Sequence, residues 1–316
     1  MQIWRDLIPV GFFLNPEVTS ALAIATAVAV ACAVTGVFVI VRGQSFLGHA
    51  LGDVGSTGAA GAYLAGVTAL FGFLAAGLVS GVAMDSLGRR AQERDVATGV
   101  VLSFMLGLSS LFLYLISATT SRSGAPIAIL FGSVFTVNPA LEPYVFTLTA
   151  LAVLLTTGLY RPLLLASTAP DVARARGVPV RLVGLVFVLA LVIAVEEAAL
   201  VVGALLSTAL VIGPASAAVR LTRRVGSALV LAVVFGIGIV WLGTILAYDS
   251  YLWPPVNRGW PVSFFVASLA LLTYLGARLA TRSRDRKGLS AWSAHRSRTP
   301  APDHSTTEPE TRWLEG

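Results

Sequence analysis

Residues 18–41 read VTSALAIATAVAVACAVTGVFVIV, a run without a single charged residue. A helix needs about 20 apolar residues to cross the hydrocarbon core of a bilayer, so this run is long enough to do so. Arg42 follows it at once. The pattern predicts a membrane-spanning helix that ends at a charged membrane surface.

The rest of the chain has the same character. Of its 316 residues, 56% are hydrophobic and 12% are charged, and the mean hydropathy is +0.82. A water-soluble domain of this length does not have such a composition, so we expect an all-α integral membrane protein with about eight or nine transmembrane helices. The predicted spans are 18–41, 47–71, 73–88, 95–116, 144–160, 181–197, 199–219, 225–247 and 261–280.

The arginines predict which loops face the cytoplasm. Cytoplasmic loops of membrane proteins carry an excess of Lys and Arg, and here alternate loops hold most of them. The predicted cytoplasmic set is Arg42, Arg89, Arg90, Arg94, Arg161, Arg174, Arg176, Arg181, Arg220, Arg223 and Arg224, whereas the opposite loops hold Arg5, Arg122 and Arg258. We therefore expect a multi-pass protein of the cytoplasmic (inner) cell membrane.

Three parts are expected along the chain. Residues 1–17 form an N-terminal interfacial segment, and residues 18–280 form the transmembrane domain. Residues 281–316 are rich in Ser, Thr, Pro and charge, which predicts a disordered basic tail on the cytoplasmic side, next to anionic lipid headgroups.

Two classes of function are excluded by the composition. Lys287 is the only lysine and precedes Gly288, whereas a P-loop needs Lys before Ser or Thr, so active transport would require an ion gradient or a separate ATPase subunit. The arginines lie scattered in short loops rather than interleaved with aromatic residues, which indicates membrane topology and no binding of nucleic acid. The sole cysteine, Cys32, has no disulfide partner.

An imidazole and a carboxylate stand one helical turn apart at His49 and Asp53, in a span rich in small residues. Side chains at i and i+4 share a helix face, and ionisable groups at membrane depth are by default candidates for a functional site. Imidazole and carboxylate suit Zn²⁺ or Mn²⁺ when water completes a loose coordination shell. The alternative is that His49 and Asp53 only pair with each other at the cytoplasmic end of a helix.

The loop 160–181 is predicted to contain a short helix of its own. Thr168 and Asp171 have the spacing of a capping box, Pro170 suits the first turn, and Gly177 suits the C-terminal cap. Arg174 near the end complements the helix dipole. A compact capped helix between two spans would serve as a docking element, with an ordinary interfacial connector as the alternative.

The third candidate region follows Glu196 and Glu197, which we expect at the outer surface, where they could attract cations to an outer mouth. Gly213 and Pro214 interrupt the next apolar run. Proline removes a backbone donor, so a bend or break with free carbonyls is expected there.

These segments, in this order, resemble the membrane permease of the metal-uptake ABC transporters for zinc, manganese and iron, the ABC-3 family. Where that family has an Arg followed by Asp-Ala-Leu-Ser-His-Ala, this chain has Arg42 and then His49-Ala-Leu-Gly-Asp53-Val, so the acid and the imidazole are exchanged. Asp171 to Gly177, including Ala173, looks like the family's Asp-x-x-Ala-x-x-x-Gly docking loop. Phe131-Gly132-Ser133 and the stretch from Gly203 to Ala217 also fit.

The resemblance implies a type II ABC importer-like permease without a nucleotide site of its own. It would assemble with a second copy of itself, two cytoplasmic ATPase subunits that use ATP, and an extracytoplasmic solute-binding protein. No cofactor is bound permanently, and the transported zinc, manganese or iron ion would contact His49 and Asp53. The alternatives are a permease for a metal chelate, such as a siderophore or haem, and a gradient-driven secondary transporter, which typically has inverted repeats.

Overall fold

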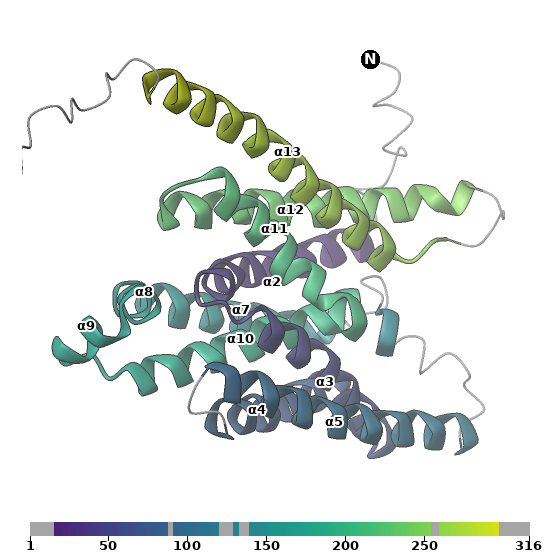
Figure 1. Ribbon diagram of the computed structural model, residues 1–316. Helices are drawn as coiled ribbons and strands as arrows, with labels where there is room; N and C mark the ends of the chain where they lie inside the picture. Colours follow the sequence, from purple (N-terminus) through teal and green to yellow (C-terminus); the bar gives the residue numbers. More distant parts are fainter. Residues whose placement is uncertain (1–15, 88–90, 120–128, 133–138, 254–258, 297–316) are drawn as a thin grey trace, which may run out of the picture.

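The computed structural model describes residues 16–87, 91–119, 129–132, 139–253 and 259–296 (Figure 1). Within these ranges the regular elements are all helices, so the predicted all-α class is confirmed. The helices are α2 (Pro16–Val41), α3 (Ser45–Leu64), α4 (Ala69–Leu87), α5 (Ala91–Thr119), η3 (Pro139–Leu141), α7 (Glu142–Gly158), α8 (Tyr160–Thr168), α9 (Pro170–Ala175), α10 (Val180–Val202), η4 (Ala204–Leu206), α11 (Ser207–Leu221), α12 (Val225–Asp249), η5 (Ser250–Leu252) and α13 (Val262–Arg296).

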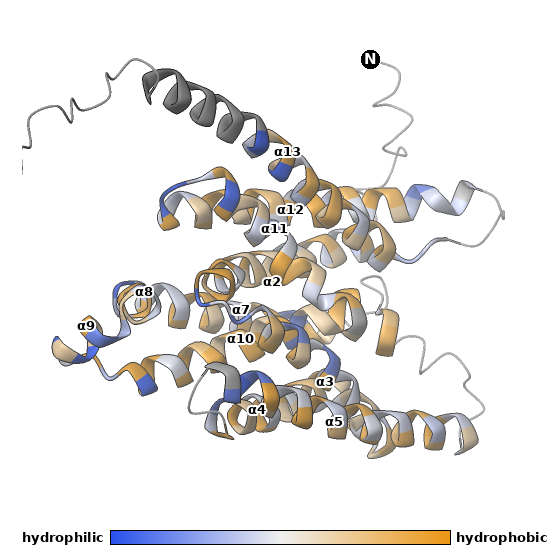
Figure 2. Cartoon of the chain, in the orientation of Figure 1, coloured by the Kyte–Doolittle hydropathy of each residue, from blue (hydrophilic) through white to orange (hydrophobic). Residues whose placement is uncertain are grey.

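Helices cover most of every predicted span, but 47–71 also includes the connection between α3 and α4, and 199–219 includes the turn at Gly203. The predicted count of eight or nine spans is not confirmed. In the described ranges, 6 helices are long and apolar enough to cross a membrane, and α7 with α8 adds a seventh if their 60° bend is a broken span. α3 is not among the six, because its many Gly, Ser and Thr residues lower its hydropathy, and α11 has only 15 residues. Figure 2 shows the apolar residues spread along the long helices.

The predicted boundary between two spans at Glu196 and Glu197 is wrong. Helix α10 runs through both residues, and both side chains are fully buried. The chain turns later, at Gly203, whose φ of 100° and ψ of 149° suit glycine. A side chain there would also collide with the backbone of Gly132, so both the backbone angles and the close packing require glycine at this position. Charge alone misplaced the boundary, because neighbouring helices cover these carboxyl groups.

Of the bend or break predicted at Gly213 and Pro214, the break is wrong, because α11 continues through both residues, and the bend stays a prediction. Gly213 lies against Ala270 of α13, and an added Cβ would be 2.7 Å from the Cβ of that alanine. The missing N–H of Pro214 therefore leaves a local gap in the hydrogen-bond ladder without ending the helix.

Close helix packing places α3 within the molecule. α3 packs against α4 and α5 on one side and approaches α10, η4 and α11 on the other. Where α3 crosses α4, Gly58 and Gly72 face each other, and a Cβ on either would collide with the backbone carbonyl of the other. Small residues of this kind let two helix backbones approach closely inside a membrane.

The structure describes only part of the two predicted end segments. Residues 1–15 of the predicted interfacial segment lie outside the described residues, and Pro16 already begins α2. At the other end, α13 continues to Arg296, well beyond the predicted start of the tail at residue 281. The rest of the predicted tail lies outside the described residues.

Candidate metal pathway and docking helix

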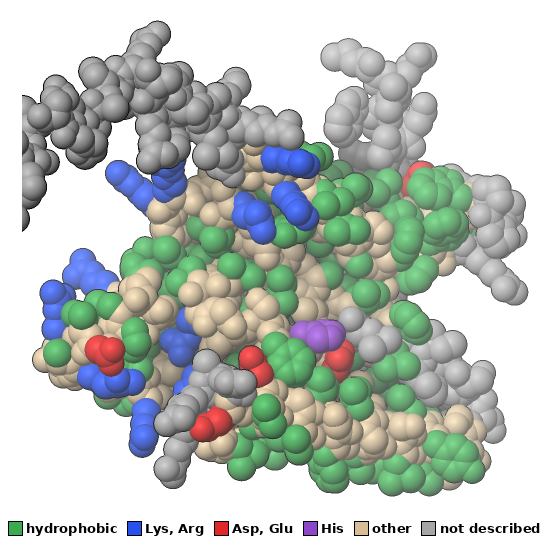
Figure 3. Space-filling model, viewed as in Figure 1, with side chains coloured by type: hydrophobic (Ala, Val, Ile, Leu, Met, Phe, Trp, Pro, Cys, Tyr) green, Lys and Arg blue, Asp and Glu red, His purple; other side chains and the backbone are tan. Residues whose placement is uncertain are grey.

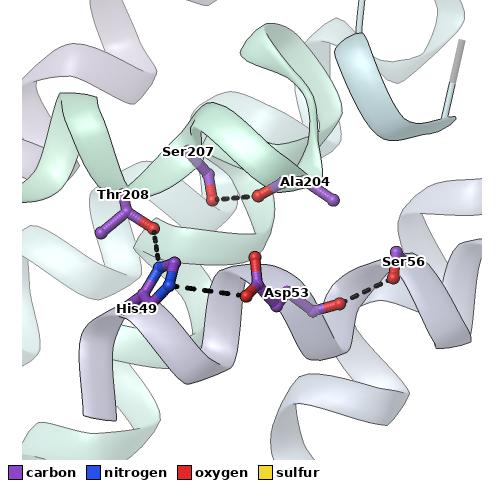
Figure 4. A network of polar contacts seen from close by, with 6 residues as sticks. All are labelled: His49, Asp53, Ser56, Ala204, Ser207 and Thr208. Atoms are coloured by element: carbon purple, nitrogen blue, oxygen red, sulfur yellow. Dashed lines mark hydrogen bonds and ion pairs between the residues drawn. The ribbon is translucent and has the colours of Figure 1, made fainter. Parts of the chain in front are cut away.

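Helix α3 brings His49 and Asp53 to one face, as their spacing predicts (Figure 4). Nε2 of His49 lies 3.6 Å from Oδ2 of Asp53. The His49 side chain is 49% exposed, whereas that of Asp53 is 12% exposed. An open imidazole and a recessed carboxylate therefore stand side by side on the wall of the bundle.

The start of α11 supplies a neighbour that sequence reasoning missed. Nδ1 of His49 lies 3.1 Å from Oγ1 of Thr208, a residue 159 positions away in the chain (Figure 4). Gly52 makes this approach possible, because a Cβ there would collide with Oγ of Ser207. Ser207 donates its own hydroxyl hydrogen bond to the carbonyl of Ala204, 3.0 Å away. The only hint in the sequence is a Ser-Thr pair shortly after Gly203.

One carboxylate oxygen of Asp53 takes no part in these contacts. Oδ1 is buried and has no hydrogen-bond partner among the described residues. Burying a carboxylate oxygen without a partner is costly, so a ligand that supplies positive charge would stabilise it. No group of three or more His, Cys, Asp or Glu side chains that could hold a metal occurs in the described ranges. His49 and Asp53 thus offer an imidazole nitrogen and carboxylate oxygens, which is an incomplete set of ligands.

Hydroxyl groups fix α3 to its neighbour on the other side. Oγ of Ser56 donates to the backbone carbonyl of Asp53 at 2.7 Å and lies 2.9 Å from Oγ of Ser109 on α5. Oγ1 of Thr57 donates to the carbonyl of Met105 at 2.7 Å. These bonds hold the turn of α3 that carries Asp53 in a fixed position against α5.

The predicted short helix in the loop 160–181 is present as α9, but Thr168 does not cap it. The N-cap position is Ala169, whose methyl group cannot accept a hydrogen bond from the first turn. Thr168 is the last residue of α8, and its hydroxyl donates a hydrogen bond to the carbonyl of Leu164. Pro170 takes the first position of α9, as predicted. The capping-box spacing was misleading because the preceding residues form a helix of their own.

The C-terminal end of α9 has the predicted glycine cap. Gly177 has a φ of 77°, its N–H donates to the carbonyl of Arg174, and the N–H of Val178 donates to the carbonyl of Ala173. This pair of bonds is a Schellman motif. Ala173 is fully buried, whereas Asp171 and Arg174 are exposed and form an ion pair of 2.7 Å. The result is a small rigid helix that presents a charged surface.

Glu196 and Glu197 do not lie at an outer mouth. The Glu196 carboxylate lies between α3 and α4, where only Gly55 and Gly77 leave room for it, and neither oxygen has a hydrogen-bond partner among the described residues. Oε2 of Glu197 accepts a hydrogen bond of 3.1 Å from Oγ1 of Thr149 on α7. Both groups belong to the interior of the helix bundle.

Two comparisons agree on the family of this protein. The model of the ABC 3 transport family matches residues 15–259. Among curated proteins, the manganese transport system membrane protein MntC of Halalkalibacterium halodurans is 32% identical over 69% of this chain and 74% of its own length. MntC of Listeria innocua is 27% identical over 78% of this chain and 86% of its own length.

A solved structure shows the same fold. PsaBC from Streptococcus pneumoniae, determined in complex with Fab, superimposes with a TM-score of 0.71 at 24% identity, covering 84% of this chain and 92% of that chain. The family match extends from the beginning of α2 to beyond α12 and includes α3, α9 and the turn at Gly203. The chain is a member of the ABC 3 transport family.

Proposed function

We propose that this chain is the membrane permease subunit of an ABC importer for a divalent transition-metal cation, with manganese as the first candidate and zinc and iron as the others. Family membership supports the transport role, and curated relatives that carry manganese in their names support the order of the candidates. The importer would lie in the cytoplasmic membrane, with the C-terminal tail of this chain on the cytoplasmic side.

The observation that carries the proposal is the pair His49 and Asp53. Their nitrogen and oxygen atoms are ligands that Mn²⁺ and Zn²⁺ accept, and Oδ1 of Asp53 is buried without a partner. Two side chains leave most coordination positions to water or to the second copy of the chain. Such loose binding suits a pathway, because an ion that is held tightly cannot leave.

The position of Thr208 suggests the depth of this pair in the membrane. Thr208 contacts His49 and lies twelve residues before Arg220, which is in the last turn of α11. At the rise of an α-helix this is ~18 Å along the axis. If Arg220 marks the cytoplasmic surface, His49 lies near the middle of a hydrocarbon core that is about 30 Å thick.

Family membership supports a proposal for the partners. Two copies of this chain would form the pathway between them, and two cytoplasmic ATPases would bind and hydrolyse ATP. Helix α9 would dock on the ATPase, since it exposes Asp171 and Arg174 while Ala173 holds it to the bundle. An extracytoplasmic binding protein would deliver the cation.

The test is uptake into proteoliposomes that contain this chain, its ATPase and its binding protein, with Mn²⁺, Zn²⁺ or Fe²⁺ and with or without ATP. We expect ATP-dependent accumulation of Mn²⁺. Replacing Asp53 with Ala should reduce uptake to background because it removes the oxygen ligands, and His49→Gln should reduce it strongly. Asp95→Ala removes an exposed carboxylate near the start of α5 and serves as the matched control.

Each result separates one function from another. Normal transport by Asp53→Ala would refute the assigned pathway. An active ATPase without accumulation of any free cation would favour a metal chelate as the substrate. Accumulation that follows a proton or sodium gradient and needs no ATP would make the protein a secondary transporter.

A further inference from the structure

A cavity of about 870 Å³ lies where α8, α9 and the start of α10 meet the turn between α2 and α3. Among the described residues, four arginines line it from separate parts of the fold, namely Arg42, Arg94, Arg174 and Arg181, and the only acidic residue in that lining is Asp85. Figure 3 shows Arg side chains gathered around α8 and α9 at this end of the molecule. The lining thus has a clear surplus of positive charge.

Two of the arginines have carboxylate partners and two do not. Arg94 lies 3.7 Å from Asp85, and Arg174 lies 2.7 Å from Asp171. Among the described residues, neither Arg42 nor Arg181 forms an ion pair. The neighbouring acids therefore leave about two positive charges in the cavity without compensation.

Arg42 is the deeper of the two and is held in a fixed position. Its Nε donates to Oε1 of Gln44 at 3.0 Å, and its guanidinium lies 5.2 Å from the ring centre of Phe187. Its Nη1 is buried and has no hydrogen-bond partner among the described residues. Burial and, secondly, the charge of Arg94 lower the pKa of Arg42 from its ordinary value, although Asp85 opposes the shift. A bound anion would satisfy Nη1 and relieve this repulsion.

The surroundings favour a phosphate group on a lipid. Arg181 stands in the first turn of α10, where the helix dipole also favours an anion. Leu185 lines the cavity, and Leu182, next to Arg181 on α10, is 58% exposed, so apolar surface adjoins the charged site. The volume exceeds what a single phosphate ion fills and suits a larger headgroup. Basic pockets at the cytoplasmic ends of membrane helices are a known setting for anionic headgroups.

We propose that this cavity binds the phosphate group of an anionic phospholipid between Arg42 and Arg181, beside helix α9. The planar guanidinium group matches phosphate oxygens in a two-pronged contact, which a lysine would not provide. The proposal concerns binding alone and does not depend on which ion the protein transports.

The test uses the complete permease–ATPase complex in nanodiscs of phosphatidylcholine, with and without phosphatidylglycerol. Thermal stability and the lipids retained in native mass spectrometry are measured, and inorganic phosphate is titrated into the discs that lack phosphatidylglycerol. We expect phosphatidylglycerol to raise the unfolding temperature and to be retained, with at least a tenfold loss of retention in Arg181→Gln and in Arg42→Gln. Since Arg181 is exposed, its variant should fold even if the Arg42 variant does not.

Arg223→Gln with Arg224→Gln is the matched control, because both residues are exposed in the short connection between α11 and α12, away from the cavity lining. Stabilisation by inorganic phosphate as well as by the lipid, lost in Arg181→Gln, would confirm the phosphate site and show that a free ion also fills it. Equal lipid retention by Arg181→Gln and the control pair would overturn the proposal. So would loss of the ATPase from Arg181→Gln with unchanged lipid, since an acidic side chain of the ATPase would then be the occupant.

Discussion

Glu196 places a carboxyl group in the interior of a chain that crosses a membrane. An unpaired buried charge is costly, and the described surroundings of Glu196 contain no hydrogen-bond partner for either oxygen. Space for the group comes from two glycines on different helices, Gly55 on α3 and Gly77 on α4. The side chain thus fills the space where three helices meet, and the two glycines provide that space because they have no side chains.

A methyl group at Gly55 should therefore destabilise the fold. In Gly55→Ala the new Cβ would meet Oε2 of Glu196 and lie 2.8 Å from the ring of Phe73. Overpacking of this kind costs about 1–3 kcal/mol, which should appear as a lower unfolding temperature of the purified chain. Gly107→Ala on α5 is the control, because nothing lies within 4 Å of an added Cβ there.

The same variant can show whether Glu196 is the obstacle. If it is, Gly55→Ala combined with Glu196→Ala should lose less stability than the two single variants added together, since the shortened side chain vacates the space. An unfolding temperature for Gly55→Ala equal to that of Gly107→Ala would mean that the three helices do not meet as described.

At the scale of residues, the sequence predicted His49 and Asp53 of the candidate site but not their neighbour Thr208. His49 and Asp53 were found because a contact at i and i+4 is local and needs only a helix. Thr208 was missed because it comes from another helix, 159 residues away, through a turn at Gly203 that the sequence did not locate. The predicted surface position of Glu196 was wrong because two adjacent charges were taken to indicate the surface. The glycines that make room for its side chain lie on other helices, far away in the sequence, so the sequence alone did not reveal them.

At the scale of elements, α9 is a very short helix for which we propose a function, docking on the ATPase. It has only 6 residues, fewer than an isolated helix needs, so its shape depends on its end cap and on its contact through Ala173. Gly177 is the residue that allows the cap, because the backbone there has a φ of 77°.

Gly177→Ala should loosen this helix without disturbing the bundle. A residue with a Cβ in the left-handed region costs about 1–2 kcal/mol, which is enough to favour opening of so short a helix. We expect the complex with the ATPase to weaken several-fold, as measured by co-purification, and ATP-driven uptake to fall with it. The unfolding temperature of the isolated permease should change little. Gly158→Ala, at the end of α7 and with nothing within 4 Å of an added Cβ, is the control. Unchanged ATPase binding by Gly177→Ala would argue against docking through α9.

The helices themselves were largely predictable, because length and apolarity decide them locally. All nine apolar segments are mostly helical, but their ends differ from the predicted ones where neighbouring helices decide them, and 199–219 is divided by the turn at Gly203. α3 ends at Leu64 rather than near residue 71, and α10 continues to Val202 because other helices cover its carboxyl groups. How many helices cross the membrane could not be read from hydropathy alone, since α3 is too rich in small polar residues and α11 too short to resemble ordinary spans.

At the scale of the whole molecule, positive charge is concentrated at one end of the helix bundle. Arg42 of the α2–α3 turn lies around one cavity with Arg174 of α9 and Arg181 at the start of α10, although it is far from both in the sequence. The positive-inside rule then orients all helices together, because their ends cannot be reversed one by one within a packed bundle. We expect this orientation to place α9 in the cytoplasm and η5, which follows the C-terminal end of α12, outside the cell.

Cysteine labelling can test that orientation, because the chain has one cysteine and it is inaccessible. Cys32 is fully buried, with its sulfur 3.3 Å from the carbonyl of Ala194, so the natural chain should not react with a membrane-impermeant maleimide. Tyr251→Cys in η5, where the side chain is 53% exposed, should react in intact cells. Arg176→Cys, exposed just after α9, should react only after the membrane is opened. The reverse pattern would place α9 outside the cell, where no ATPase could dock and where the cavity beside it would face the outer leaflet.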